Sequence, residues 1–308
     1  MKRLFLIALL VTASAAAQVR AANPVNLKCE YLVNPIGLDA KQPRFTWQMN
    51  DKRPGAAQSA YQLFVYSDAQ GKQLVWQTDK INGQDILATY QGKPLSPFSK
   101  YWWKVQLWDH AGKSSQSPLA SFETGMMGDA WQGKWITDTD DKDLKPAAYF
   151  RKTFPAARKI ASARAYIAVA GLYELYINGE KIGNHRLDPM YTRFDRRNLY
   201  VTYDVTKQLQ SGTNAIGVLL GNGWYNHQST AVWDFHNAPW RARPAFCLDL
   251  RITYSDGSQE VIKSNDDWKT ALSPVIFNSI YTAEHYDARL ELPGWNTHLV
   301  STMHNGSR

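Results

Sequence analysis

Short apolar runs alternate with polar residues along the first hundred positions, and clusters of turn residues separate the runs. Alternation with a period of two is typical of strands in a half-buried sheet, and no long stretch keeps the 3.6-residue period of an amphipathic helix. The pattern is clearest in RFTWQM (44–49), AYQLFVYS (60–67), LVWQT (74–78) and SKYWWKVQLWD (99–109). It predicts a β-sandwich over residues 25–125.

The segment LSPFSKY (95–101) refines this prediction. Its Leu, Pro and Tyr have the spacing found in fibronectin type III sandwiches, where the tyrosine hydroxyl bonds to backbone upstream in a tyrosine corner. We therefore expect Tyr101 at such a corner. Trp47 and Trp103 fall at inward positions of their strands, so we interpret both as core residues rather than as a binding surface.

A second strand-rich region follows Gly128 and extends over residues 131–297. Asn178-Gly179 and Asp256-Gly257 each separate two apolar runs, and such dipeptides are strong signals for β-hairpins. Only residues 205–216 have a helix-like pattern, and this segment is short. The pattern predicts a jelly-roll-like sandwich, so the chain as a whole is expected to be all-β, with two consecutive β-sandwiches.

The first 22 residues have the layout of a secretory signal peptide. Lys2 and Arg3 precede an apolar run over 4–11, and small residues follow. The apolar run is much shorter than the roughly 20 residues that a membrane-spanning helix needs. We expect cleavage and export to the periplasm or the exterior, with no membrane anchor.

Composition narrows the classes of partner and cofactor. The 308 residues carry a formal charge of +8, but the 35 Lys and Arg are scattered and form no basic helix or nucleic-acid motif, so no nucleic-acid partner is expected. Cys29 and Cys247 fall in different predicted domains, which favours two buried thiols over a disulfide. Neither these cysteines nor the spacing of the histidines suggests a zinc site.

Two loop-rich segments of the second region, 187–198 and 222–240, combine aromatic rings with Asp, Asn and Arg. Aromatic faces that cover the C–H side of a pyranose, with polar groups for its hydroxyls, are what a sugar site requires. The candidate sugar-binding residues are Asp188, Tyr191, Asp195, Arg196, Asn198, Asn222, Trp224, Tyr225, Trp233 and Asp234.

Structural roles compete with this hypothesis at each position. Trp224 and Tyr225 are also suited to closing the end of the sandwich, and Arg196 or Arg197 to pairing with Asp195 and ordering its loop. Inverting glycoside hydrolysis needs two carboxylates about 6.5–9.5 Å apart, and loop carboxylates are more often turn formers, so we assign no catalytic residue. The candidate carboxylates for such a pair are Asp188, Asp195, Asp204, Asp234, Glu284 and Asp287.

Several motifs together resemble a known family. The series YWWKVQLWDHAGKSS (101–115), SFETG (121–125), GLYELYINGEKIG (171–183), LDPMYTRFDRRNLYVTYDVT (187–206), LLGNGWY (219–225) and YTAEHYDARLELPGW (281–295) is similar to the N-terminal part of bacterial α-L-rhamnosidases of glycoside hydrolase family 78. The resemblance implies a fibronectin-III-like sandwich, a rhamnosidase N-terminal sandwich and, further along the complete enzyme, an (α/α)6 barrel that holds the catalytic carboxylates.

The resemblance ends near Trp295, and residues 298–308, HLVSTMHNGSR, depart from the family and carry no strand or helix signal. A frameshift, a premature stop or a gene-prediction artefact would produce such a tail. We therefore expect an exported, non-catalytic part of an α-L-rhamnosidase that recognises a rhamnose-containing glycan or supports the catalytic barrel. Because relatives of the second domain include calcium-assisted rhamnose-binding modules, the resemblance allows a calcium ion. Part of a working rhamnosidase and a protein-interaction spacer are the alternatives.

Overall fold

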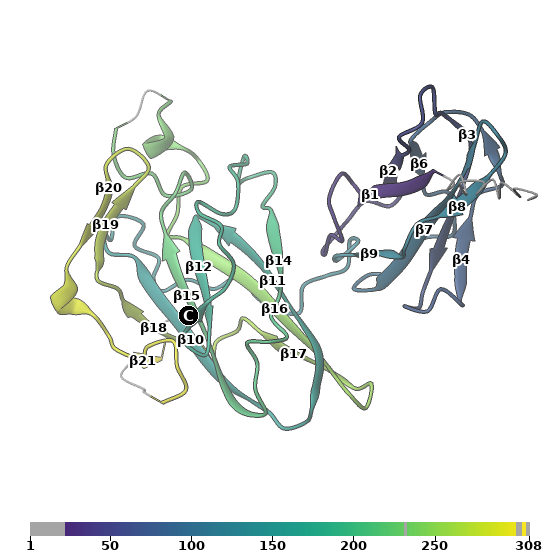
Figure 1. Ribbon diagram of the computed structural model, residues 1–308. Coiled ribbons are helices and arrows are strands. Elements are labelled where there is room, and N and C mark those ends of the chain that lie inside the picture. The colour runs from purple at the N-terminus through teal and green to yellow at the C-terminus, as the bar shows by residue number, and fades with distance from the viewer. Residues whose placement is uncertain (1–21, 231–232, 300–303, 306–308) are drawn as a thin grey trace, which may run out of the picture. The chain divides into compact units, whose positions relative to one another are not determined.

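The computed structural model describes residues 22–230, 233–299 and 304–305 (Figure 1). The predicted signal peptide lies outside the described residues except for Ala22, and so does most of the tail 298–308. Contacts between residues divide the chain into two compact units, with the division after Glu123. Unit 2 also takes in the short segments Ile36–Asp39 and Ser96–Phe98.

Unit 1 is an antiparallel β-sandwich. One sheet has the strand order β1-β2-β6, and the other has the order β4-β3-β7-β8, with β5 on β3 and β9 on β7. The strands are β1 (Asn23–Cys29), β2 (Arg44–Asn50), β3 (Gln58–Tyr66), β4 (Leu74–Gln77), β5 (Ile81–Asn82), β6 (Leu87–Thr89), β7 (Lys100–Asp109), β8 (Ser114–Gln116) and β9 (Ala120–Glu123). The four strands that the alternation predicts are all present.

Aromatic side chains from facing strands fill the core of unit 1. Trp103 on β7 is fully buried, and its ring centroid lies 4.7 Å from that of Phe45 on β2. Trp47 is buried as well, and its indole N–H donates a hydrogen bond of 3.0 Å to Gln58 Oε1. The assignment of both tryptophans to the core is confirmed. Tyr101 is buried and stacks on Phe122, whereas its tyrosine-corner bond stays a prediction.

Unit 2 is a second, larger antiparallel sandwich. Its sheets have the orders β13-β12-β15-β10-β18-β21 and β14-β11-β16-β17, and a separate hairpin pairs β19 with β20. The strands are β10 (Ala148–Ala156), β11 (Ile160–Ala170), β12 (Leu172–Ile177), β13 (Glu180–Lys181), β14 (Tyr200–Asp204), β15 (Gly212–Gly221), β16 (Ala245–Tyr254), β17 (Gln259–Lys263), β18 (Lys269–Leu272), β19 (Val275–Ser279), β20 (Ala283–Tyr286) and β21 (His304–Asn305).

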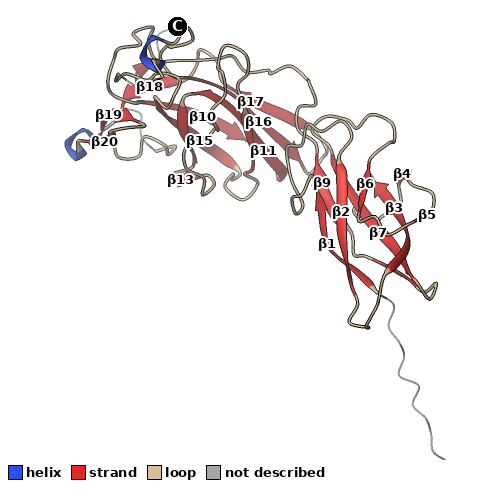
Figure 2. Cartoon of the chain, turned by 90° about the horizontal axis from the view of Figure 1, so that it is seen from above, coloured by secondary structure: helices blue, strands red, loops and turns tan. Residues whose placement is uncertain are grey.

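Helix is nearly absent from the described residues. It is confined to two single turns of 3-10 helix, η1 (Phe235–Asn237) and η2 (Ala288–Leu290) (Figure 2). The prediction of an all-β chain with two sandwiches is confirmed. Within the described part of the chain, no helix is long and apolar enough to cross a membrane.

Aliphatic residues dominate the core between the two sheets of unit 2. Alternate residues of β11 and β16, such as Ala165, Ile167, Leu248 and Leu250, are completely buried. Among its aromatic members, Phe246 packs against both Phe150 and Trp268. Both predicted hairpins form, since Asn178-Gly179 joins β12 to β13 and Asp256-Gly257 joins β16 to β17.

Two local expectations are wrong. Residues 205–211 form turns rather than a helix, because Gly212 has a φ of +97° and the buried Asn214 side chain bonds both the N–H and the C=O of Gln210. The tail was expected to lack a strand, yet His304–Asn305 pairs with β18. Cys29 and Cys247 are both free and buried, as predicted.

Candidate functional site

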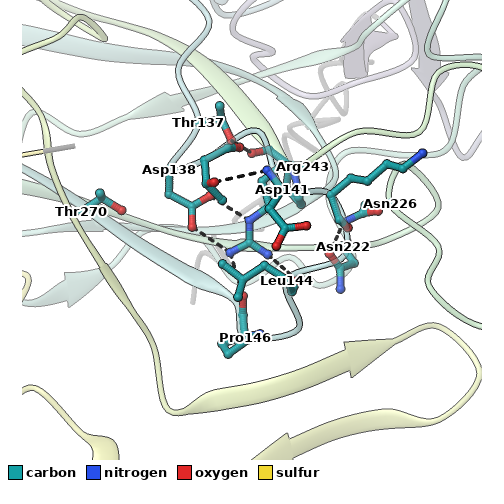
Figure 3. Close-up of polar contacts among 12 residues, drawn as sticks. Thr137, Asp138, Asp141, Leu144, Pro146, Asn222, Asn226, Arg243 and Thr270 are labelled. Atoms are coloured by element: carbon teal, nitrogen blue, oxygen red, sulfur yellow. Dashed lines mark hydrogen bonds and ion pairs between the residues drawn. The ribbon is translucent and has the colours of Figure 1, made fainter. Parts of the chain in front are cut away.

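A buried ion pair fixes the segment that leads into β10. The Arg243 guanidinium donates to both carboxylate oxygens of Asp138 at 2.8 Å and to the carbonyls of Leu144 and Pro146 (Figure 3). Both charged side chains are almost fully buried. A bidentate pair whose remaining donors are also satisfied meets the condition under which a buried charge is tolerated. This end of unit 2 is therefore a rigid base.

An asparagine network ties the loop after β15 to the β19–β20 hairpin. The backbone N–H of Asn222 donates to Asn278 Oδ1 at 2.6 Å, and its side-chain amide donates to the Asn278 carbonyl. Asn226 donates to Asn222 Oδ1 at 3.0 Å and accepts from Arg241 (Figure 3 draws the first of these contacts). Asn222 is buried, so the structure places this candidate in the scaffold rather than on the surface.

The two loops singled out in the sequence meet above this base. Tyr191 of the first loop lies 6.4 Å from Trp224 and 5.7 Å from Phe235, measured between ring centroids. Phe194 lies 5.2 Å from Tyr225. A third segment, the turn between β19 and β20, adds a further ring. We call this group the aromatic cluster, and its members are Tyr191, Phe194, Trp224, Tyr225, Phe235, Trp240 and Tyr281.

Exposure separates the members that can meet a ligand from those that hold the cluster together. Tyr191 is 47% exposed and Tyr281 is 54% exposed, whereas Trp224 and Tyr225 are half-buried. Trp233 is 73% exposed at the edge of the second loop. Trp224 and Tyr225 thus pack partly within the cluster, while Tyr191, Tyr281 and Trp233 face solvent.

The polar candidates of the first loop are engaged in local contacts. Asp188 Oδ2 lies 2.7 Å from His185 Nδ1 and 3.5 Å from the hydroxyl of Tyr203. Asp195 pairs with Arg193, with Nε 2.9 Å from Oδ1. The expected pairing of Asp195 with Arg196 or Arg197 is therefore wrong, because the guanidinium of Arg193 donates to both carboxylate oxygens of Asp195.

The remaining polar candidates occupy different positions. Arg196 and Asp234 are exposed, and Asp234 precedes η1 in a left-handed conformation with φ of +51°. Asn198 donates to the carbonyl of Phe194 at 3.3 Å, while its buried Oδ1 has no hydrogen-bond partner in the described structure. The structure thus leaves Arg196 and Asp234 available to solvent.

A groove of about 520 Å³ adjoins the aromatic cluster. Its floor is the outer face of β10, β12 and β15, and the β19–β20 hairpin lines it as well. Leu187, Gly223 and Ile280 line it, and each of them directly precedes a candidate or cluster residue. The groove is therefore contiguous along the chain with the aromatic cluster at Trp224 and Tyr281, and with the candidate residue Asp188.

Glu174 and Tyr176 are the main polar groups on the groove floor. The Tyr176 hydroxyl donates to Glu174 Oε2 at 2.6 Å, and Lys181 pairs with the same carboxylate. Burial alone would raise the pKa of Glu174, but the hydrogen bonds from Lys181 and Tyr176 outweigh it and hold the pKa below its ordinary value. Glu174 is therefore an ionised acceptor and not a protonated acid at neutral pH.

Three of the six candidate carboxylates pair with an arginine, Asp195 with Arg193, Asp204 with Arg164 and Asp287 with Arg289. Asp188 contacts the ring of His185. Asp234 and Glu284 are exposed, and Glu284 lines the groove. Across the residues that the structure describes, no group of three His, Cys, Asp or Glu is suited to hold a metal ion. The arrangement is typical of structural ion pairs rather than of an acid and base facing a sugar.

Sequence reasoning missed Tyr281 and the groove. Tyr281 lies outside both candidate loops, and it reaches the cluster because the β19–β20 hairpin is tied to Asn222, 56 residues from Asn278. Phe194 and Phe235 lie inside the two predicted loops and could have been included on composition alone.

Comparison with known proteins identifies both units. The family described as "Rha78A-like, N-terminal immunoglobulin domain" matches residues 24–128, and the "Alpha-L-rhamnosidase N-terminal domain" family matches residues 158–305. An α-L-rhamnosidase of Formosa agariphila is 33% identical over 299 residues, which cover 86% of this chain and 31% of the relative. One from Alteromonas sp. is 32% identical and covers 93% of this chain and 33% of the relative.

A solved structure agrees with these matches. The α-L-rhamnosidase from Dictyoglumus thermophilum superposes with a TM-score of 0.83 at 38% identity, over 93% of this chain and 34% of that one. The chain thus spans about a third of the length of these relatives. The resemblance inferred from the motifs is confirmed, and the chain belongs to the α-L-rhamnosidase family as an N-terminal region with an immunoglobulin-like domain and a rhamnosidase N-terminal domain.

Proposed function

We propose that the chain is the exported, non-catalytic N-terminal part of an α-L-rhamnosidase, and that unit 2 recognises rhamnose-containing glycans. One observation carries the proposal. Three segments distant in sequence bring exposed rings to one end of the sandwich, where a groove of about 520 Å³ adjoins them. The relatives, all α-L-rhamnosidases, supply the class of sugar.

The chemistry of the surface fits a neutral sugar. L-Rhamnose is a deoxy sugar with a methyl group and an apolar C–H side, which can lie against Tyr191, Trp233 or Tyr281. Arg196, Asp234 and Glu284 are exposed near these rings or in the groove and offer donors and acceptors for hydroxyl groups. The rigid asparagine and arginine base beneath limits the ordering that binding would require.

Calorimetric titration with L-rhamnose, with calcium and again with chelator, tests the proposal. Trp233→Ala should weaken binding because it removes an exposed stacking face without touching the core. Trp135→Ala is the matched control, since Trp135 is also an exposed tryptophan of unit 2 but lies outside both candidate loops. Loss of affinity in both variants, or no heat from the wild type at millimolar sugar, would refute the proposal that this surface binds rhamnose.

The non-catalytic role has a separate test. Purified chain should release no product from an aryl α-L-rhamnoside, because three of the six candidate carboxylates are paired with arginines and Asp188 contacts His185. Turnover that disappears on substitution of a carboxylate within 131–297 would favour the alternative of a working rhamnosidase. Inactivity together with absence of sugar binding would favour a spacer or protein-interaction role.

A further inference from the structure

Arg151 is a buried cation on the outer side of unit 2. It alternates with the core residue Phe150 along β10, so it points away from the aliphatic core, and yet it is only 4% exposed. One guanidinium nitrogen, Nη2, donates to the carbonyl of Thr297. Its Nε is also buried and has no hydrogen-bond partner within the described residues. A guanidinium has five N–H donors, and this one satisfies few of them.

The charges around Arg151 do not compensate it. Lys269 lies directly across from it in the β10–β18 register, and Lys152 is the next residue along the strand. Asp267 is the one carboxylate lining the same pocket, but it is exposed, lies 3.6 Å from Lys152 and accepts a hydrogen bond from Asn265. No ion pair to Arg151 occurs in the described structure. Arg151 therefore has no counter-charge among the described residues.

Burial makes this arrangement costly. Desolvation lowers the pKa of Arg151, and it is the largest cause of the lowered pKa of Lys152. A buried charge is normally paired, because removing it from water without a counter-charge is strongly unfavourable. Either Arg151 has only a structural role, in holding the Thr297 carbonyl, or it belongs to a site that binds an anion.

The space beside Arg151 favours the anion. A pocket of about 340 Å³ is lined by Arg151, Lys152, Thr153, Asp267, Lys269, His298 and Leu299. We propose that this pocket is an oxyanion site that takes a carboxylate or a sulfate on the Arg151 guanidinium. The planar fork matches two oxygens of such a group, and the lysines add positive potential. The site is distinct from the surface proposed for rhamnose, which is a neutral sugar, so either proposal can fail without the other.

Two oxyanions distinguish the sources of the ligand. Calorimetric titrations with sodium sulfate and with sodium glucuronate, at ionic strength held constant with sodium chloride, should each give saturable binding to the wild type. Binding of sulfate alone would identify an inorganic anion, and binding of glucuronate as well would identify a carboxylate ligand such as an acidic sugar. Saturation by neither anion would overturn the proposal.

Variants of Arg151 distinguish an anion-binding role from a purely structural one. Arg151→Met should abolish binding of both anions and, in chloride alone, should leave the melting temperature unchanged or higher because an unpaired buried charge has been removed. Arg164→Gln is the control, since Arg164 is a similarly placed strand arginine that already pairs with Asp204. A lower melting temperature for Arg151→Met with anion binding retained would show a purely structural role.

A milder variant covers the case in which Arg151→Met fails to fold. Lys152→Gln keeps the guanidinium and removes one neighbouring charge, so it should weaken sulfate binding several-fold while the protein stays folded. Equal sulfate affinity in Lys152→Gln, Arg164→Gln and the wild type would count against the pocket as the binding position.

Discussion

Both sandwiches bury aromatic rings in their cores, but unit 2 also gathers rings in its loops. In unit 1, Trp47, Trp103, Phe45 and Phe122 lie on strands and are buried in the core. In unit 2, alternating aliphatic residues of β11 and β16 fill much of the core, and Tyr191, Trp233 and other rings lie in loops. Aromatic content alone therefore says little about binding. The position of a ring, on a strand or in an irregular loop, indicates whether it is needed for the core.

The two units also differ in how much of their structure follows from local sequence and how much from contacts between distant segments. Period-two alternation predicts the strands of unit 1, although unit 1 also holds buried polar contacts, from Trp47 to Gln58 and from Arg53 to Asp109. The candidate loops of unit 2 rest on buried polar contacts from Arg243 to Asp138 and from Asn222 to Asn278. The placement of these loops thus depends on contacts between segments distant in sequence, which alternation does not specify.

The largest expected effect tests the core assignment of unit 1. Trp103→Ala should lower the free energy of unfolding of unit 1 by about 3–5 kcal/mol, because it leaves a large cavity between the two sheets. Trp233→Ala in unit 2 should change it by less than about 0.5 kcal/mol, since that side chain is mostly exposed. Urea unfolding of both variants gives the comparison, and similar losses would remove the distinction between strand and loop rings.

Trp224→Ala should fall between these two. From the loop position alone we would expect almost no effect on stability, but Trp224 is half-buried and packs on Tyr191, Phe235 and Tyr281. We expect a loss of about 2 kcal/mol, roughly half the cost of truncating a core tryptophan. Thermal unfolding and L-rhamnose titration of the same variant show whether the ring acts mainly through the cluster or also through the ligand.

Tyr101→Phe probes a polar contact inside the aromatic core of unit 1. If Tyr101 forms the predicted tyrosine corner, loss of its hydroxyl should cost about 1–3 kcal/mol by leaving a buried acceptor unpaired. Tyr66→Phe is a suitable control, because Tyr66 is a buried tyrosine of the same sheet that the corner motif does not include. An unchanged urea midpoint for Tyr101→Phe would exclude the corner.

The smallest expected effect concerns acid stability of unit 2. The folded pKa of Glu174 lies below its ordinary value near 4.5, so its contribution is present above that value and is lost as the pH falls through the folded pKa. Glu174→Gln should therefore lower stability at pH 7 by less than about 1 kcal/mol, because the pair is partly exposed. The difference from wild type should shrink as the pH falls below 4.5 and through the folded pKa. A difference independent of pH would assign the effect to packing.

The sequence predicts much of the fold because its signals are local. Alternation identifies the strands of both sandwiches, and Asn178-Gly179 fixes a hairpin through its own backbone preference. The two candidate loops were also identified from composition. The sequence could not predict that Arg193 rather than Arg196 holds Asp195, that Asn222 is buried against Asn278, or that Tyr281 joins the cluster. These contacts depend on geometry between segments, which no local pattern encodes.

The two free cysteines have a practical consequence. Cys29 belongs to unit 1 and Cys247 to unit 2, and both are buried. Burial is the main cause that raises the pKa of Cys247 to about 12, and it raises that of Cys29 as well, so neither thiol reacts readily in the native fold. Each cysteine can therefore serve as a chemical probe for the opening of its own sandwich. The rate at which a thiol reagent labels one cysteine reports how often that sandwich opens, and mass spectrometry reads the two rates from one sample.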